Sequence, residues 1–557
     1  MISDFYVECL DCGHQESYNP SKPTCSNCQG TWRRACYDYA SVAADLPFLL
    51  RQRPLSLWRY RELLPIRSPN PDLSLGEGGT PLIHAINLGL MLGCPNLYIK
   101  DERQGPTASF KDRQAAVTIT ALKEAGISEM VVASTGNVAI AYSAYAARAS
   151  IKLWAFLTSL VPVAKMREVA LYGTQVIKVT ASYDQAKQVA AEFARQKGLY
   201  LDQGARTVAS VEAMKTIAFE IAEQLGEICY KTSLMDSPRL KSPDWYLQSV
   251  SGGMGPLGVT KGFNELYQMG MVDEIPRYGI IQAEGCSPMV QAWKQGLDVA
   301  EPVRSPRTNI ATLATGDPGR TYTLLNHTIQ QTGGAFESVT DEEAFRAMHF
   351  LAKMEGISVE PAAAVAFAGL VKLIRMGVIH SKDTVVVNCT GHTTPTDETV
   401  LGSGWARDVV LPTQTMTQAP EEGLLAALSR VTLDRYPKIA IIDDNPDVRR
   451  LICRILQAQG NYTILEAVNG KEAIEIARNQ QPDLIILDLM MPEMDGFGVI
   501  DALQAKPETA SIPVIVVTAK ELTVEEKKRL KGTIQTLMQK GDFMNDEFMD
   551  EVHALIR

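Results

Sequence analysis

The chain has 557 residues, which at about 150 residues per domain leaves room for three or four domains. Hydrophobic residues make up 46% of the chain and charged residues 21%, a balance that excludes disordered and collagen-like proteins. Acidic side chains outnumber basic ones by 64 to 54, so the chain lacks the positive field that phosphate backbones require, and we expect no nucleic-acid partner.

The first predicted domain, residues 1–40, carries two C-x-x-C pairs, Cys9 with Cys12 and Cys25 with Cys28. No apolar run in the chain reaches the roughly 18 to 20 residues that span a bilayer, and no secretory signal is recognisable, so we expect a cytoplasmic protein without a membrane partner. In that reducing compartment paired cysteines bind metal rather than form disulfides. The spacing predicts a small ribbon closed by a structural zinc ion; four incidental thiols are the alternative.

The second predicted domain, residues 41–408, alternates amphipathic helical patterns with short β-branched runs. This alternation predicts a parallel sheet with helices on both faces. The helical patterns span 107–126, 208–226 and 341–356, and the strand runs span 130–135, 152–158, 174–180, 278–284 and 383–390.

Two short motifs in this domain have the residue types that chemistry needs. Lys111 follows Phe110, and burial of an amine beside an aromatic ring lowers its pKa, which makes it a nucleophile and a proton shuttle. Residues 252–255, GGMG, open a predicted helix after a strand, where backbone N–H groups and the helix dipole attract an anion. Taken singly, each motif also fits an ordinary helix cap or turn.

Several segments together resemble a known family. The segments are LSLGEGGTPL, LYIKDERQGPTASFKDR, ASTGN, SVSGGMGPLG and VNCTGH. In this order they resemble the fold type II pyridoxal-phosphate (PLP) enzymes, and in particular the threonine synthase family, over about residues 5–400. The resemblance implies a two-lobed domain like the tryptophan synthase β subunit, within an α/β multidomain chain. Members of this family often carry an N-terminal zinc ribbon based on cysteines, and the resemblance suggests a homodimer.

The resemblance also implies roles for individual residues. Lys111 would hold PLP as a Schiff base, and Asn137 would bond the phenolic oxygen of the cofactor. The segment Gly252, Gly253, Met254 and Gly255 would bind its phosphate, and Thr390 would face the pyridine nitrogen, which a hydroxyl leaves unprotonated.

The positions that the resemblance assigns to substrate binding depart from the family pattern. Members that use O-phosphohomoserine usually have Thr after STGN, an Arg in the segment NPxRIEGQKT and a Lys in TGHGxKD. Here Val138 follows STGN, Thr207 stands where the Asn of NPxRIEGQKT would be, and Ser210 replaces the Arg. Ala213 and Met214 replace Gly and Gln, and no lysine follows Gly391 in TGHTTPTD. A phosphate needs cations or several N–H donors, so we expect elimination or replacement on a different small amino acid, with Lys111 removing the α-proton.

Residues 409–436 are rich in Pro, Thr and Gln without periodicity and are predicted to be a linker. The last predicted domain, residues 437–557, has five strand-like runs separated by helical patterns, which predicts a small five-stranded parallel sheet. Polar residues end these runs, so they should meet at the carboxyl edge, where such sheets bind ligands. They are Asp443, Asp444, Asp488, Thr518 and Lys540.

The segments IIDDN, LDLMMPEMDG, VTAK and MQKG resemble the receiver domain of response regulators, a flavodoxin-like fold, over residues 438–557. By this resemblance Asp488 accepts a phosphoryl group, and Asp443, Asp444 and Asp488 hold Mg²⁺. Thr518 and Lys540 would bind the phosphoryl oxygens. An inert decoration with chance carboxylates is the alternative. Leu537 stands where the family often has the Tyr or Phe that moves on phosphorylation.

Two hypotheses cover the whole chain. In the first, a PLP-dependent lyase or synthase is regulated through phosphorylation of Asp488 by a sensor histidine kinase or a phosphotransfer protein. In the second, the PLP-like part is a catalytically impaired scaffold that acts as a sensor or interaction platform for the receiver. The retained Lys111, Asn137 and Thr390 favour the first, and the altered substrate positions favour the second.

Overall fold

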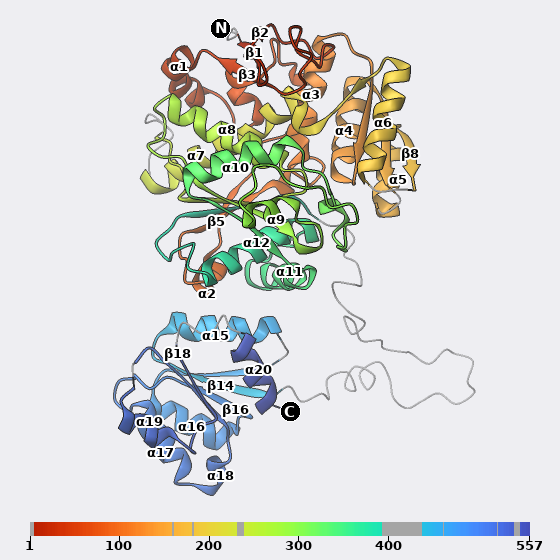
Figure 1. Cartoon of the computed structure of the whole chain (residues 1–557). Coiled ribbons are helices and arrows are strands. Elements are labelled where there is room, and N and C mark those ends of the chain that lie inside the picture. The colour runs from red at the N-terminus through yellow and green to blue at the C-terminus, as the bar shows by residue number, and fades with distance from the viewer. Residues whose placement is uncertain are drawn as a thin grey trace, which may run out of the picture. The chain divides into compact units, whose positions relative to one another are not determined.

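The structure is a computed structural model that describes residues 5–158, 161–180, 183–230, 239–392, 437–459, 462–520, 522–539 and 546–556. The described chain forms two compact units (Figure 1). The predicted linker 409–436 and the predicted boundary at residue 408 lie outside the described residues. None of the described helices is long and apolar enough to cross a membrane.

The first unit begins with a small antiparallel ribbon. Its strands are β1 (Phe5–Cys9), β2 (Gln15–Glu16) and β3 (Arg33–Tyr37), in the order β2-β1-β3. Polar bonds fix the ribbon to the rest of the unit: the Tyr37 hydroxyl donates to Glu212 at 3.1 Å, and Lys261 Nζ donates to the Ala35 carbonyl at 2.7 Å. The ribbon is therefore an integral wall of the first unit.

Two further sheets form the two lobes of the first unit. The six-stranded sheet has the order β12-β11-β10-β13-β5-β4, in which β4 alone runs antiparallel to its neighbour. The four-stranded sheet has the order β8-β7-β6-β9 and is parallel throughout. The strands are β4 (Leu82–His84), β5 (Leu97–Asp101), β6 (Glu129–Ser134), β7 (Lys152–Thr158), β8 (Gln175–Val179), β9 (Tyr200–Leu201), β10 (Trp245–Ser249), β11 (Arg277–Ala283), β12 (Ala335–Val339) and β13 (Val385–Cys389).

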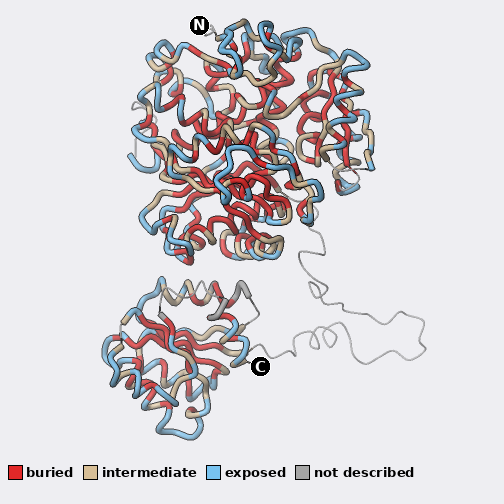
Figure 2. Tube along the Cα trace, viewed as in Figure 1, coloured by how far each residue is buried: buried red, intermediate tan, exposed pale blue. Residues whose placement is uncertain are grey.

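Helices cover both sheets, so the central strands β5, β10 and β13 are buried at every residue instead of alternating (Figure 2). Helix α12 packs along β10, β11 and β13, and α7 packs against α8. The α-helices before residue 393 are α1 (Tyr39–Gln52), α2 (Ile86–Met91), α3 (Lys111–Glu124), α4 (Asn137–Ala149), α5 (Val163–Leu171), α6 (Tyr183–Lys197), α7 (Val208–Tyr230), α8 (Met254–Gln268), α9 (Pro288–Lys294), α10 (Arg320–Thr332), α11 (Asp341–Glu355) and α12 (Pro361–Arg375). The predicted two-lobed architecture is confirmed.

A buried ion-pair network ties the lobes of the first unit together. Arg113 on α3 is 1% exposed and pairs with Glu102 at 2.8 Å and with Glu220 on α7 at 2.7 Å. Lys100 on β5 is fully buried and pairs with the same Glu220 at 2.7 Å. Each of these charges has opposite charges and hydrogen bonds around it, which offsets the cost of removing it from water.

The second unit contains the predicted parallel five-stranded sheet, and its strands have the order β15-β14-β16-β17-β18. Its strands are β14 (Lys438–Ile442), β15 (Thr463–Ala467), β16 (Leu484–Leu487), β17 (Val514–Thr518) and β18 (Thr536–Gln539). Its helices are α15 (Pro446–Gln459), α16 (Gly470–Gln480), α17 (Gly496–Gln504), α18 (Pro507–Ala510), α19 (Val524–Leu530) and α20 (Asp546–Leu555). The fourth strand is buried at every residue, which fits a sheet with helices on both faces.

Candidate active site and metal sites

A cavity of about 430 Å³ lies in the first unit where several strands end. Ser249 ends β10, Thr390 follows β13, Thr135 follows β6 and Asp202 follows β9, and all four line the cavity. Every residue that the sequence assigned to the cofactor also lines it, although 279 positions separate the first from the last (390 − 111). They are Lys111, Asn137, Gly252, Gly253, Met254, Gly255 and Thr390.

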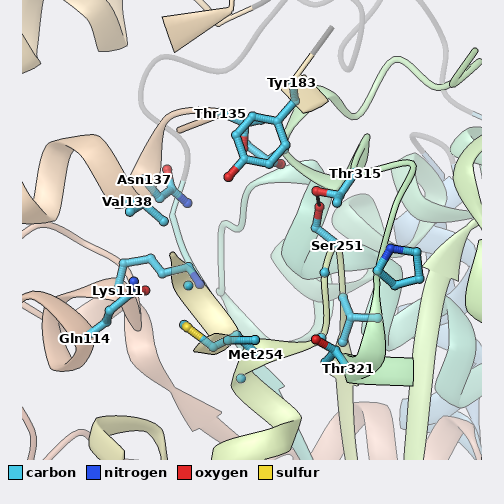
Figure 3. Close-up of a pocket in the computed structure, with 18 of the residues that line it drawn as sticks. Lys111, Gln114, Thr135, Asn137, Val138, Tyr183, Ser251, Met254, Thr315 and Thr321 are labelled. Atoms are coloured by element: carbon cyan, nitrogen blue, oxygen red, sulfur yellow. Dashed lines mark hydrogen bonds between the residues drawn. The ribbon is translucent and has the colours of Figure 1, made fainter. Parts of the chain in front are cut away.

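Lys111 is the first residue of α3 and points into the cavity (Figure 3). The helix predicted over 107–126 begins only at Lys111, because the Asp112 carboxylate accepts bonds from the Thr107 N–H at 2.9 Å and the Thr107 hydroxyl at 2.6 Å and holds the preceding loop. The Lys111 amine lies 4.1 Å from the centre of the Phe110 ring. Burial lowers the pKa of Lys111 to about 8, and the charges of Asp202 and Glu360 oppose this shift.

Asn137 opens α4 and faces the same cavity as Lys111 (Figure 3). Its Nδ2 donates to Glu360 Oε1 at 2.7 Å, and its Oδ1 accepts from Lys165 Nζ at 2.7 Å. The Glu360 carboxylate lies close to the backbone of Gly391, where a Cβ would lie 2.8 Å from Glu360 Oε1. The glycine of TGH therefore gives the carboxylate room to hold Asn137 in position.

Two glycines at the start of α8, Gly253 and Gly255, leave no space for a side chain. Gly253 has φ of +81°, and a Cβ there would lie 2.9 Å from the side chains of Met289 and Thr321. A Cβ on Gly255 would lie 2.4 Å from Gln248 Nε2. Gly253 and Gly255 therefore present backbone N–H groups that no side chain of their own covers, as a cradle for an anion must.

Two observations indicate that the residues of the cavity fit PLP. Gly253 and Gly255 at the start of α8 have no room for a Cβ, and the buried hydroxyl of Ser249 has no hydrogen-bond partner among the described residues. Thr390 is 4% exposed, and its carbonyl accepts from the Phe110 N–H at 3.0 Å, which ties the end of β13 to the segment before Lys111. Amine, anion cradle and hydroxyl thus surround one space.

Sequence reasoning missed several residues of the cavity. Gln114 lies one turn after Lys111 on α3, so helical spacing could have found it. Asp202 follows a two-residue strand, and Glu360 precedes a proline at the start of α12; neither position carries a periodic signal. Trp32 from the ribbon and Tyr183 at the start of α6 also line the cavity, and the Ser251 and Thr315 hydroxyls bond each other on one side of it (Figure 3).

Most of the substituted substrate positions lie away from the cavity surface. Val138 lines the cavity, whereas Ala213 and Met214 are fully buried in the hydrophobic core. The Thr207 hydroxyl accepts from the Gln203 N–H at 2.9 Å, and Ser210 lies behind Asp202. Arg206 lines the cavity on its exposed side, and its guanidinium has no partner within the part of the chain that the structure describes.

The four ribbon cysteines converge as predicted. Their sulfur atoms all lie within 4.8 Å of one another, with Cys9 Sγ 3.5 Å from Cys28 Sγ and Cys12 Sγ 3.8 Å from Cys25 Sγ. A backbone hydrogen bond from His14 lowers the pKa of Cys12 to about 6, which favours the thiolate that a metal requires. Two buried and two exposed thiols around one point can hold one tetrahedral metal ion.

The second unit brings together three carboxylates at the carboxyl edge of its sheet. Oxygen atoms of Asp443, Asp444 and Asp488 lie within 4.8 Å of one another. Asp443 and Asp488 are buried, Asp444 is exposed, and Thr518 ends the neighbouring strand β17 with 1% exposure. Lys540 lies outside the described residues. An exposed carboxylate beside two buried ones is an arrangement that a hard divalent cation can use.

Known protein families match residues in both units. Residues 73–391 match the family model of pyridoxal-phosphate dependent enzymes, and residues 439–552 match the response regulator receiver domain. A threonine synthase of Methanosarcina acetivorans is 36% identical over 71% of this chain and 94% of the relative. A threonine synthase of Methanocaldococcus jannaschii is 35% identical over 69% of this chain and 91% of the relative.

Among solved structures, diaminopropionate ammonia lyase from Escherichia coli superposes with a TM-score of 0.50 at 16% identity, over 64% of this chain and 90% of that chain. This likeness concerns the fold. The match over 73–391 makes the chain a member of the pyridoxal-phosphate dependent enzymes. Within them it belongs to the threonine synthase family, and its C-terminal part is a receiver domain.

Proposed function

We propose that the chain is a PLP-dependent lyase or synthase that carries out elimination or replacement on a small amino acid other than O-phosphohomoserine. The observation that carries this proposal is Lys111, an amine with a pKa near 8 that faces an anion cradle in one cavity. Gly252 to Gly255 would hold the cofactor phosphate, Asn137 the phenolic oxygen and Thr390 the ring nitrogen. When bound, PLP supplies an electron sink for the α-carbon of an amino acid.

The residues of the chain then have separate tasks. The Lys111 amine would bind the cofactor aldehyde and would move the proton at the α-carbon of the substrate. The lowered pKa suits this task, because an amine with a pKa near 8 gains and loses a proton readily near neutral pH. Glu360 and Lys165 hold the Asn137 amide so that its donor and acceptor face fixed directions.

The test of this proposal is a spectral and product screen on the full-length holoenzyme. The purified protein is expected to be yellow, and the Lys111→Ala variant colourless. A panel of small amino acids is then added, and changes in the cofactor spectrum and release of α-keto acid and ammonia are measured. A colourless parent protein rules out a PLP enzyme, and a yellow protein that responds to no amino acid supports the scaffold instead.

The scaffold is the second candidate function, and a specific observation favours it. By the family resemblance, Ser210 stands where an arginine would help to bind the carboxylate or phosphate of the substrate, and here it is fully buried and does not line the cavity. A PLP-fold protein that has lost part of its substrate site can serve as a ligand sensor for an attached domain. Spectral change on binding without any product release would support this reading.

We further propose that Asp488 accepts a phosphoryl group from a sensor histidine kinase or a phosphotransfer protein, with Mg²⁺ held by Asp443, Asp444 and Asp488. The convergence of the three carboxylates supports this role. Labelling by a small-molecule phosphodonor is expected to require Mg²⁺ and to disappear in Asp488→Ala. The exposed Asp501 on α17 provides the matched control, and Asp501→Ala should label normally. Persistent labelling of Asp488→Ala would refute the assignment.

The same proposal includes regulation of the enzyme by the receiver, a structural zinc ion at Cys9, Cys12, Cys25 and Cys28, and a homodimer. Regulation is tested by measuring turnover before and after phosphorylation in the parent protein and in Asp488→Ala. A change of rate in the parent alone supports coupling, and equal rates in all four states refute it. Metal analysis and sedimentation of the purified chain test the zinc ion and the dimer.

A further inference from the structure

One wall of the cavity is built from hydrogen-bond acceptors that the proposed chemistry does not use. Asp202 lines the cavity and is 8% exposed. Its Oδ1 accepts from the Gly204 N–H at 2.8 Å, and its Oδ2 accepts from Gln114 Nε2 at 2.8 Å. No described residue forms an ion pair with it, although its charge acts on Lys111. A buried carboxylate without a cation favours a ligand that brings hydrogen-bond donors.

Gln114 adds a second acceptor to the same wall. It is 2% exposed and lies one turn after Lys111 on α3, so both side chains share one face of the helix. A carboxylate accepts and cannot donate, so the bond to Asp202 fixes Nε2 toward Asp202 and identifies the other amide atom as the oxygen. This Oε1 is buried and has no partner among the described residues. An acceptor left in this state is satisfied by a donor on a ligand.

Described residues directly behind this wall carry hydroxyl groups. Ser210 donates to Asp202 Oδ1 at 3.5 Å and lies 3.1 Å from Thr118 Oγ1. Among the described residues, the cations that line the cavity are Lys111, which would hold the cofactor, Lys187, which pairs with Asp184 at 2.6 Å, and the exposed Arg206. A phosphate group placed against Asp202 and Gln114 Oε1 would meet a negative charge and a lone pair.

We propose that Asp202 and Gln114 form the subsite for the substrate side chain and select a side chain that ends in a hydrogen-bond donor, a hydroxyl or an ammonium group, against a phosphate ester. The donor bonds Asp202 and Gln114 Oε1 together. This inference rests on the proposed function, because it assumes that the amino acid reacts at a cofactor held by Lys111. It explains why Ser210 needs no positive charge: the group that it supports is an anion.

The test compares three ligands on the holoenzyme. L-Homoserine, L-2,4-diaminobutyrate and O-phospho-L-homoserine are titrated, and each Kd is measured from the cofactor spectrum and from the heat of binding. We expect homoserine or diaminobutyrate to bind at least about tenfold more tightly than the phosphate ester, as one hydrogen bond to a charged group implies. The tighter of the two distinguishes a hydroxyl-bearing from an ammonium-bearing substrate.

Two variants locate the effect. Asp202→Asn removes the charge and keeps the shape, and Gln114→Met removes the acceptor without changing charge, so the second remains usable if the first fails to fold. Each is expected to weaken the preferred ligand by about tenfold and to weaken the phosphate ester less. The exposed Glu192, on α6 outside the cavity, supplies the control Glu192→Gln, which should change nothing.

Three outcomes overturn the inference. In the first, the phosphate ester binds most tightly to the parent protein. In the second, both variants weaken all three ligands equally, which would indicate a merely structural role. A holoenzyme whose spectrum and heat respond to none of the ligands contradicts the proposed function as well. If only the proposed subsite is wrong, the ligands still bind but with the wrong order of Kd values. If the proposed enzyme function is wrong, no ligand changes the spectrum or releases heat.

Discussion

Substituting Gly253 by alanine tests the anion cradle, and Gly270 provides a matched control at the other end of α8. Both glycines have positive φ, +81° and +66°, so alanine costs about 1–2 kcal/mol of backbone energy at either position. A Cβ on Gly270 has nothing within 4 Å, whereas a Cβ on Gly253 would lie 2.9 Å from Met289 and Thr321. Overpacking adds about 1–3 kcal/mol, so Gly253→Ala should lose about 2–5 kcal/mol of unfolding free energy.

The larger difference is expected in cofactor binding. When the backbone moves to relieve the contacts of the added Cβ in Gly253→Ala, the first N–H groups of α8 are displaced from the cofactor phosphate. One hydrogen bond to a charged group is worth about 1.5–3 kcal/mol, or at least tenfold in Kd. Apoprotein of each variant is titrated with PLP by absorbance, and unfolding is followed by denaturant. The reasoning is refuted if Gly253→Ala binds PLP within twofold of Gly270→Ala.

Three further predictions concern Lys111, the buried ion pairs and the ribbon. With a pKa near 8, the Lys111 amine is protonated below pH 8, so the rate at which apoprotein takes up PLP should rise through pH 8 and then level off. Arg113→Met leaves Glu102 and Glu220 partly unpaired and should cost about 3–5 kcal/mol in chemical denaturation of the first unit. Chelation of the zinc ion proposed for the ribbon should lower the melting temperature and change the fluorescence of Trp32, which lines the cavity.

A different result would contradict each of these predictions. An uptake rate that keeps rising toward pH 10 would mean that Lys111 has an ordinary amine pKa. Arg113→Met with parental stability would mean that the buried pairs contribute nothing net, and the unfolding of the receiver serves as the internal control. A chelation signal of equal size in Trp32→Phe would assign the fluorescence change to another tryptophan.

The sequence was most informative where short motifs follow strands. Lys111, Asn137, the glycine segment and Thr390 were predicted from family motifs, and the structure brings all of them to one cavity. The physical reason is general: the carboxyl ends of parallel strands meet at one edge, so residues that end different strands become neighbours. The same rule brought Asp443, Asp444 and Asp488 together in the second unit.

The sequence was less informative where tertiary contacts decide the local structure. The helix expected from residue 107 starts at Lys111, because Asp112 captures Thr107 and so prefers a loop to another helical turn. Asp202 was not predicted from the sequence, because the strand before it has two residues, too few for a periodic pattern. Asp202 is paired in the cavity wall with Gln114, which is distant in the sequence and adjacent in space.

The most direct test of the central claim is to identify the lysine that carries the cofactor. The holoenzyme is reduced with borohydride, which fixes the cofactor to its lysine, and the modified peptide is sequenced by mass spectrometry. Lys111 and Lys187 both line the cavity, and Lys165 contacts Asn137, so the experiment has real alternatives. Modification of Lys111 alone is the predicted result; modification of Lys165 or Lys187, or of no lysine, would contradict the account.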